Sequence, residues 1–275
     1  MAAGRRLVAL VAVVAVFLSP AVAADATAFS SASLRGGPPF ESIFAFGDAF
    51  TDTGNNPVVW SWYNVSDEVM RPPYGMTYFG GVPTGRNSNG RLIIDFIAQG
   101  LGLPLVPAYQ SHEGSFRQGA SFAVADATAL NASFFDSRQT DISLEMQLGW
   151  FEELKPSLCK TDQAKQRLIQ HGAKTLVVPG MIPSGCLPSI LVASAADADT
   201  SSEYDATTGC LKEPNEIVAL HNSLLQDAVE KLQEKHPDLT IMYTDMFNNV
   251  MEMVRSPQQF GMSASLCSSS FDNLH

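Results

Sequence analysis

Short apolar runs alternate with longer amphipathic stretches along the chain, and this alternation predicts the order of its elements. Four runs have the length and apolar content of buried strands. They are residues 42–46, 122–125, 175–178 and 240–243, and the third of them, closed by Pro and Gly, is the clearest. Strands that alternate with helical stretches imply a parallel sheet with helices on both faces.

Helices are expected in five places between and after these strands. Their bounds are 92–101, from Leu144 to a stop at Pro156, 161–171, from Ile217 to a stop at His236-Pro237, and from residue 246 to Arg255. The fourth has an apolar stripe at i, i+3, i+4 spacing, which is typical of a helix that packs on a core. This stripe consists of Ile217, Leu220, Leu224, Leu225, Ala228, Val229 and Leu232. Residues 55–89, rich in Pro, Gly, Asn and Tyr, are expected to be irregular.

The N-terminal segment has the three-part layout of a secretory signal. Arg5 and Arg6 precede an apolar run from Leu7 to Leu18, and small residues follow at the spacing that signal peptidase reads. The run is too short to cross a bilayer core of about 30 Å. We therefore predict a signal peptide at residues 1–23, a loose leader at 24–40, and one incomplete domain at 41–275, with secretion to the extracellular space and no membrane span.

Charge and composition exclude some classes of protein. The chain of 275 residues is 45% hydrophobic and has a formal net charge of −11. Loss of Arg5 and Arg6 with the signal would change that charge from −11 to −13. Such a surface repels nucleic acid and anionic membranes, which excludes polyanion binding. The length suits one α/β domain with a single large core.

Cysteines and sequons fit an oxidising compartment. Four cysteines follow the predicted signal, at positions 159, 186, 210 and 267, and no CxxC spacing indicates a metal site. Cys186 and Cys210 flank a loop rich in Ala, Asp, Ser and Thr, where a bridge would contribute roughly 3 kcal/mol. Asn64 and Asn131 begin Asn-x-Ser sequons and are candidate glycan acceptors.

Several ordered motifs then resemble the plant-type GDSL esterase/lipase family, a branch of the SGNH hydrolases. The first is Gly47-Asp48-Ala49-Phe50 with Asp52-Thr53-Gly54-Asn55, where members of the family read Gly-Asp-Ser-Leu. The others are Pro83-Thr84-Gly85-Arg86, Asn89-Gly90-Arg91-Leu92, Gln118-Gly119-Ala120-Ser121-Phe122-Ala123, Lys174-Thr175-Leu176-Val177-Val178-Pro179-Gly180, Pro183-Ser184-Gly185-Cys186, Thr208-Gly209-Cys210-Leu211 and His221-Asn222-Ser223-Leu224-Leu225. The resemblance covers nearly all of the chain after the signal, in order.

The resemblance implies acyl transfer to a serine on a three-layer α/β/α sandwich. In such a site a histidine takes the proton of the serine, and an aspartate three residues earlier orients the histidine. Here the nucleophile position is Ala49, Gly119 matches the oxyanion glycine, and Asp272 and His275 match the final Asp-x-x-His. Asp126 stands where the family has the glycine of a Gly-Ala-Thr step.

Two family segments are missing from the sequence. The block that carries the oxyanion asparagine and an interior strand is reduced to residues 160–167, and no helix follows His275. The resemblance therefore implies a sandwich that lacks one interior strand and the C-terminal helix. The first strand would then pair directly with residues 175–178, or the fold would be compromised. A Cys186–Cys210 bridge is expected, with Cys159 and Cys267 unpaired or mispaired.

Three hypotheses about function remain open at this level. The chain is a catalytically silent homologue of an ester hydrolase, a binding protein for a small ester or acylated glycan, or a truncated product that folds poorly. No phosphate loop, zinc motif or basic aromatic patch is present in the sequence, so no cofactor and no metal are expected. We expect a monomer.

Overall fold

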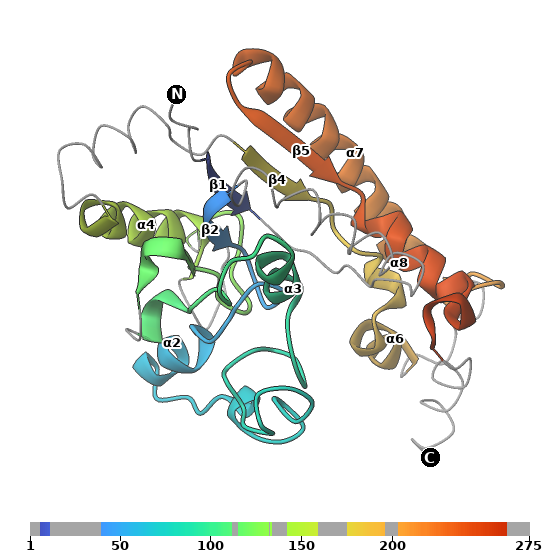
Figure 1. The fold of residues 1–275 in the computed structure, drawn as a ribbon. Coiled ribbons are helices and arrows are strands. Elements are labelled where there is room, and N and C mark those ends of the chain that lie inside the picture. Colours follow the sequence, from blue (N-terminus) through green and yellow to red (C-terminus); the bar gives the residue numbers. More distant parts are fainter. Residues whose placement is uncertain are drawn as a thin grey trace.

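A five-stranded parallel sheet organises the chain, in the order β3-β2-β1-β4-β5 (Figure 1). The strands are β1 (Arg6–Val11), β2 (Phe40–Phe46), β3 (Gly119–Ser121), β4 (Thr175–Pro179) and β5 (Thr240–Thr244). This computed structural model describes residues 6–11, 40–111, 115–131, 133, 142–158, 175–195 and 203–262.

Six α-helices and five short 3-10 helices lie in the described part of the chain. The α-helices are α2 (Asn56–Trp62), α3 (Ile93–Gly100), α4 (Leu144–Leu158), α6 (Pro188–Ala195), α7 (Lys212–Lys235) and α8 (Met246–Arg255). The 3-10 helices are η2 (Glu68–Met70), η3 (Tyr109–Ser111), η4 (Phe116–Gln118), η6 (Ser184–Cys186) and η8 (Pro257–Phe260). No helix within these ranges is long and apolar enough to cross a bilayer.

Strand β2 lies at the centre of the core because apolar side chains project from both of its faces. Ile43 and Ala45 point to one face, where they pack with Ile94 and Ala98 of α3. Phe44 and Phe46 point to the other face and pack with Phe122 and with Leu154 of α4. A strand buried on both faces reads as a continuous apolar run. Helix, sheet and helix therefore form three layers around β2.

The second group of elements joins β4 and β5 to α6, α7 and α8, beside the first group in Figure 1. Gln233 near the end of α7 accepts from Ile241 N at 2.7 Å and donates to Leu239 O at 2.8 Å, which fixes the turn from α7 into β5. Met246 at the start of α8 is buried in the cluster around Ile43, and Val177 of β4 packs against it. This cluster connects the two groups.

Most predicted elements agree with the structure in type and position. The predicted strands at 42–46, 175–178 and 240–243 lie within β2, β4 and β5, and all described strand pairings are parallel, as expected. Helices α3, α7 and α8 begin and end within a few residues of their predicted bounds. The predicted helix at 161–171 lies outside the described residues.

Some expectations differ from the structure in informative ways. Strand β3 covers residues 119–121 rather than 122–125, although Phe122 N and Val124 N continue the ladder by donating to Ala45 O and Gly47 O. Helix α4 continues through Pro156 to Leu158, although a proline at this position lacks the backbone donor of one helical hydrogen bond. Helices α2 and α6 lie where the sequence indicated irregular chain.

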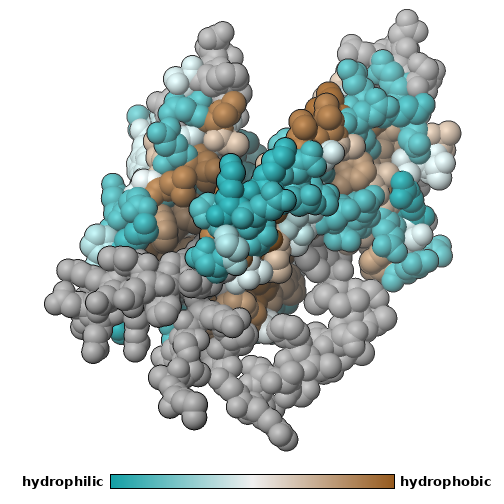
Figure 2. All heavy atoms as spheres, turned by 90° about the horizontal axis from the view of Figure 1, so that it is seen from above, coloured by the Kyte–Doolittle hydropathy of each residue, from teal (hydrophilic) through white to brown (hydrophobic). Residues whose placement is uncertain are grey.

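The expected apolar stripe of α7 is only partly buried. Val218, Asn222 and Val229 face the protein, whereas Ile217, Leu220 and Leu224 are each 60% exposed or more. In Figure 2 hydrophobic atoms lie at the surface on both sides of a hollow between two masses of atoms. The spacing of apolar residues identifies a helix with an apolar face, but it does not show whether the rest of the chain covers that face.

The N-terminal segment takes part in the sheet. The segment predicted as the apolar run of a secretory signal contributes β1, the middle strand of the sheet. Residues Val8, Ala9 and Leu10 pair with Ile43, Phe44 and Ala45 on one side and with Thr175, Leu176 and Val177 on the other. Direct pairing of β2 with β4, which the shortened sequence suggested, is therefore not what the structure has.

Candidate active-site loop

The loop from Gly47 to Asn55 follows the carboxyl end of β2, between that strand and α2. The Asp48 carbonyl accepts from Thr51 N at 3.1 Å and from Asp52 N at 3.0 Å, which makes a tight turn around Ala49 and Phe50. Ligands of open parallel sheets bind outside the carboxyl ends of the strands. The loop thus has the position of a site, and Ala49 is only partly buried in it.

A buried carboxylate holds this loop in shape. Asp52 is fully buried and accepts from the backbone N–H groups of Gly54, Asn55, Asn56 and Ala125 at 2.7–3.0 Å. Burial raises the pKa of Asp52 to about 7, although the four N–H donors act in the opposite direction. Four backbone donors on one side chain leave the loop little freedom to rearrange.

Asn55 ties the same loop to two other parts of the chain. Its Nδ2 donates to Ser121 O and to Ala123 O, each at 2.8 Å, and its Oδ1 accepts from Gln110 N at 2.7 Å. The side chain is fully buried and uses both of its polar atoms. Asn55 therefore joins the loop after β2 to the loop after β3 and to η3.

Gln147 of α4 braces the start of the loop. Its Oε1 accepts from Gly47 N at 2.8 Å, and its Nε2 donates to Gly47 O at 2.8 Å. This fully buried side chain satisfies both backbone groups of Gly47, the residue before Asp48. The position of Ala49 is thus fixed from both sides, by Gln147 before it and by Asp52 after it.

A second ion-paired brace lies against the loop. Arg86 and Asp95 form two hydrogen bonds of 2.9 Å, and Arg86 Nη1 donates to Thr53 O at 3.1 Å. Both charged side chains are buried, and such a pair is stable only when its geometry and remaining hydrogen bonds are good. A Cβ at Gly54 would lie 2.7 Å from Thr84 O, so the two segments pack backbone against backbone.

Two carboxylates, those of Asp48 in this loop and of Asp126, lie near each other. Asp48 Oδ1 accepts from Phe50 N at 3.1 Å. Burial, and to a smaller extent the nearby charge of Asp126, raise the pKa of Asp48. Asp126 has a φ of 65°, a backbone conformation that glycine adopts more easily. The site is therefore more negative than one with glycine at 126 would be.

Gly119, the predicted oxyanion glycine, lies at the start of β3. It pairs with Ile43, three residues before the end of β2, which corresponds to about 10 Å along the strand. A Cβ at Gly119 would overlap the Ile43 carbonyl oxygen, and φ is 132°. Asp48 and Asp126 lie near each other after the ends of β2 and β3, whereas Gly119 permits close approach of the two strands.

The comparisons with known proteins agree on one family. The family model of the GDSL-like lipase/acylhydrolases matches residues 43–159 and 152–275. The chain belongs to this family. It is 34% identical to the GDSL esterase/lipase At5g45910 of Arabidopsis thaliana, across 82% of this chain and 75% of that protein. It is also 33% identical to a sinapine esterase of Brassica napus, across 81% of this chain and 70% of that one.

The remaining predicted residues lie in different parts of this GDSL-family chain. Cys186 and Cys210, the pair named from the sequence, form a disulfide between η6 and the segment that precedes α7. Asn64 and Asn131 are exposed, and Asn131 Nδ2 donates to Glu145. The other predicted site and cysteine positions, Asp272, His275, Cys159 and Cys267, lie outside the described residues.

Sequence reasoning gave no role to Gln147 or Asn55. Gln147 is three residues after Leu144 and four before Phe151, so it lies on the apolar face of a predicted helix. A polar residue on such a face has to find a buried partner, and that pattern could have indicated it. Asn55 stands in the first family motif, but nothing local to it indicates which distant backbone groups it binds.

Proposed function

We propose that this chain is a GDSL-family homologue of secreted carboxylic-ester hydrolases that does not itself turn over esters. The observation that carries the proposal is the residue at position 49. The family resemblance implies a serine there, and a methyl group has neither a lone pair to attack a carbonyl nor a proton to transfer. The loop around Ala49 is braced as a site, but it lacks a nucleophile.

The neighbouring hydroxyl groups are poor substitutes for a serine at position 49. Thr51 is fully buried, and its Oγ1 donates to Phe46 O at 3.3 Å. Ser121 is fully buried, and its Oγ donates to Thr51 O at 2.7 Å. Ser42 is buried within β2. A nucleophile has to reach the substrate, and buried hydroxyl groups of this kind do not.

The local charge also disfavours acyl transfer. The oxyanion of a tetrahedral intermediate is stabilised by donors and positive dipoles. Here the carboxylates of Asp48, the residue before Ala49, and of Asp126 lie near each other, and their mutual repulsion contributes to the raised pKa of Asp48. We infer that the missing family block also removes the oxyanion asparagine and that Asp272 and His275 are vestigial. Loss of one such donor costs about 10²–10³ in kcat.

The test is ester hydrolysis by the wild type, Ala49→Ser and Ala49→Gly, with p-nitrophenyl butyrate as the substrate. We expect all three to remain near the uncatalysed rate. Triad enzymes that lack one residue retain roughly 10³–10⁴-fold acceleration over water, but only with an intact oxyanion hole. Ala49→Gly controls for changes of shape at the same position, and equal melting temperatures would show that all three proteins fold alike.

Two results would contradict the proposal. Wild-type turnover well above background, unchanged in Ala49→Gly, would show a nucleophile elsewhere. Turnover in Ala49→Ser alone would show that the oxyanion donors and the histidine are in place, so that only the serine is missing. A ligand without turnover would be detected in the same samples as a rise in melting temperature on adding a non-hydrolysable ester.

We also expect the protein to enter the secretory pathway as a monomer and to carry glycans. The exposed positions of Asn64 and Asn131 support glycosylation, because the transferase needs an accessible amide. Expression in plant cells followed by glycosidase treatment would test this. A mobility shift in the wild type that is reduced in Asn64→Gln and in Asn131→Gln is expected, and an unglycosylated secreted protein would refute it.

A further inference from the structure

Exposed apolar side chains gather where helix α2 ends, around one of the two predicted glycan acceptors. Trp62 is 52% exposed and Tyr63 is 39% exposed, and Val65, on the other side of Asn64, is 45% exposed. Contiguous exposed apolar side chains mark interaction sites more often than scattered ones do. The sequon from Asn64 to Ser66 lies within the same few residues. A glycan on Asn64 is therefore the group best placed to cover this surface.

The backbone fixes Asn64 at the end of α2. Its N–H donates to Ser61 O at 3.1 Å, and Val65 N donates to Trp60 O at 3.1 Å. Asn64 has a φ of 56°. These are the two hydrogen bonds and the left-handed residue of a Schellman motif, in which Asn64 takes the position that is most often glycine. Two residues span at most about 7 Å, so a sugar on the Asn64 side chain can reach Trp62.

The ring of Trp62 is held in place by a second helix. It meets Trp150 of α4 edge to face, with 6.3 Å between the ring centroids and 85° between the ring planes. Trp150 in turn packs against the buried cluster that contains Val59 of α2. Helix α4 also contributes Gln147, which braces the loop of the candidate site. A ring held in this way loses little freedom when another group packs on its exposed part.

The chemistry of the first sugar suits such a surface. An N-acetylglucosamine has C–H groups on the faces of its ring and hydroxyl groups at its rim, and the negative face of an aromatic ring attracts C–H groups. We propose that the first sugar of a glycan on Asn64 packs on the exposed ring of Trp62 and stabilises the contact between α2 and α4. This inference rests on glycosylation of Asn64, which belongs to the proposed function, and does not depend on the proposed lack of esterase activity.

The experiment compares the melting temperatures of the secreted wild type, Ser66→Ala, Trp62→Leu and the double variant. Ser66→Ala removes the sequon but keeps Asn64 in its cap, and Trp62→Leu keeps an apolar side chain without the flat ring. We expect Ser66→Ala to melt about 2–4 °C below the wild type. With Trp62→Leu present, the same change should make less than half that difference. Ser133→Ala is the matched control, because the sequon that it removes has Ala129 two residues before its asparagine, and it should leave the melting temperature unchanged.

A second measurement needs no change at Trp62 and keeps the test decisive if that variant does not fold. Wild type trimmed by a glycosidase to one N-acetylglucosamine per asparagine should melt as the intact protein does. Acrylamide should quench its tryptophan fluorescence less than that of Ser66→Ala.

Equal melting or equal quenching of wild type and Ser66→Ala would overturn the proposal, as would an equal loss of melting temperature with and without Trp62. The mobility of the same samples on a gel separates two kinds of failure. An Asn64 that carries no glycan would refute glycosylation and packing together. An occupied Asn64 with unchanged melting would refute the packing on Trp62 alone.

Discussion

Residues 40–158 and residues 175–262 contribute unequally to the interior of the described chain. All members of the three buried apolar clusters come from the first region, except Met246. The second region buries apolar residues such as Val218, Val229 and Ile241 in smaller contacts. It also exposes Ile217, Leu220 and Leu224 on α7 and Met242 on β5.

The difference extends to polar groups. The first region contains the loop around Ala49 and the buried side chains that hold it, namely Asp52, Asn55, Arg86, Asp95 and Gln147. The second region uses a disulfide and the side chains of Asn222 and Gln233, which bind backbone groups nearby. The candidate site therefore lies in the region with the larger buried core, residues 40–158. The second region joins the first through the pairing of β4 with β1 and through the cluster around Met246.

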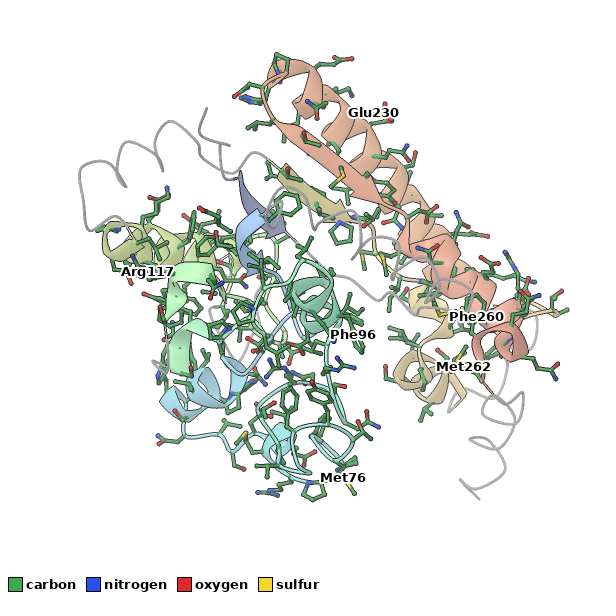
Figure 3. The ribbon with its side chains drawn as sticks, in the orientation of Figure 1. Met76, Phe96, Arg117, Glu230, Phe260 and Met262 are labelled. Atoms are coloured by element: carbon green, nitrogen blue, oxygen red, sulfur yellow. A yellow bond between two sulfur atoms is a disulfide. The ribbon has the colours of Figure 1, made fainter. Side chains whose placement is uncertain are left out.

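The largest effect is expected for Arg86→Ala. The substitution removes both bonds to Asp95 and leaves that carboxylate buried without its ion-pair partner, which typically costs about 3–5 kcal/mol. Chemical unfolding of the purified variant measures this change. Arg117→Ala is the matched control, because Arg117 is exposed on η4 (Figure 3) and should cost less than about 0.5 kcal/mol. Similar losses in both variants would mean that the Arg86–Asp95 brace contributes little.

Gly119→Ala should cause the next largest loss of stability. The added Cβ would overlap the Ile43 carbonyl oxygen, and the φ of 132° is strained for any other residue. Together these should cost about 3 kcal/mol. In Gly149→Ala, where a Cβ has no neighbour within 4 Å in α4, a gain of up to about 1 kcal/mol is expected. A stable Gly119→Ala protein would show that β2 and β3 are not so closely paired.

The sequence predicted much of the fold because local patterns determine it. The apolar runs of β2 and β4, the helical spacing in α3 and the Pro237 stop after α7 are all local signals, and the structure agrees with them. The use of Arg6–Val11 as an interior strand could not be predicted. It depends on a gap between β2 and β4, and a gap between distant segments has no local signal.

The position of the candidate site in the chain could be predicted from the sequence, but the hydrogen bonds that hold it could not. The first motif indicates the loop after β2, and Ala49 is read directly from it. The partners of Asp52, Asn55 and Gln147 are up to 100 residues away, and nothing near these residues in the sequence identifies them. The distance of Gly119 from the loop likewise depends on strand register, which a motif match does not contain.

A pair of substitutions on α7 tests whether its exposed stripe contributes to stability. Val218 is buried, so Val218→Ala should cost about 1–2 kcal/mol through lost burial and a small cavity. Leu220 is 63% exposed, and Leu220→Ala should stay within about 0.5 kcal/mol. Thermal unfolding measures both. A larger loss for Leu220→Ala would mean that another part of the molecule covers this face, and the contrast between the two regions would weaken.

A further prediction concerns pH, and its sign differs between the two regions. The folded-state pKa of Asp52 is raised from 3.8 to about 7, so the folded protein binds this proton more tightly than the unfolded chain does. The contribution of Asp52 to stability is therefore fully present below about pH 4 and is lost as the pH rises to 7, by at most about 1.4 kcal/mol per pH unit. Asp205 in the second region is only partly buried, and hydrogen bonds from Thr208 N and Oγ1 and from Thr207 N lower its pKa. Its contribution is present above about pH 4 and is lost as the pH falls.

Asp52→Asn and Asp205→Asn separate these two contributions, because every other carboxylate is common to wild type and variant. The difference in unfolding free energy between wild type and each variant is measured from pH 3 to pH 8. For Asp52→Asn, wild type minus variant should fall as the pH rises from 4 to 7, in addition to a constant loss from replacing an acceptor of four N–H groups. For Asp205→Asn the difference should rise slightly as the pH rises from 3 to 4 and then stay level. A flat difference for Asp52→Asn would mean that its four donors fully offset the effect of burial, so that the pKa of the carboxyl is the same in the folded and the unfolded chain.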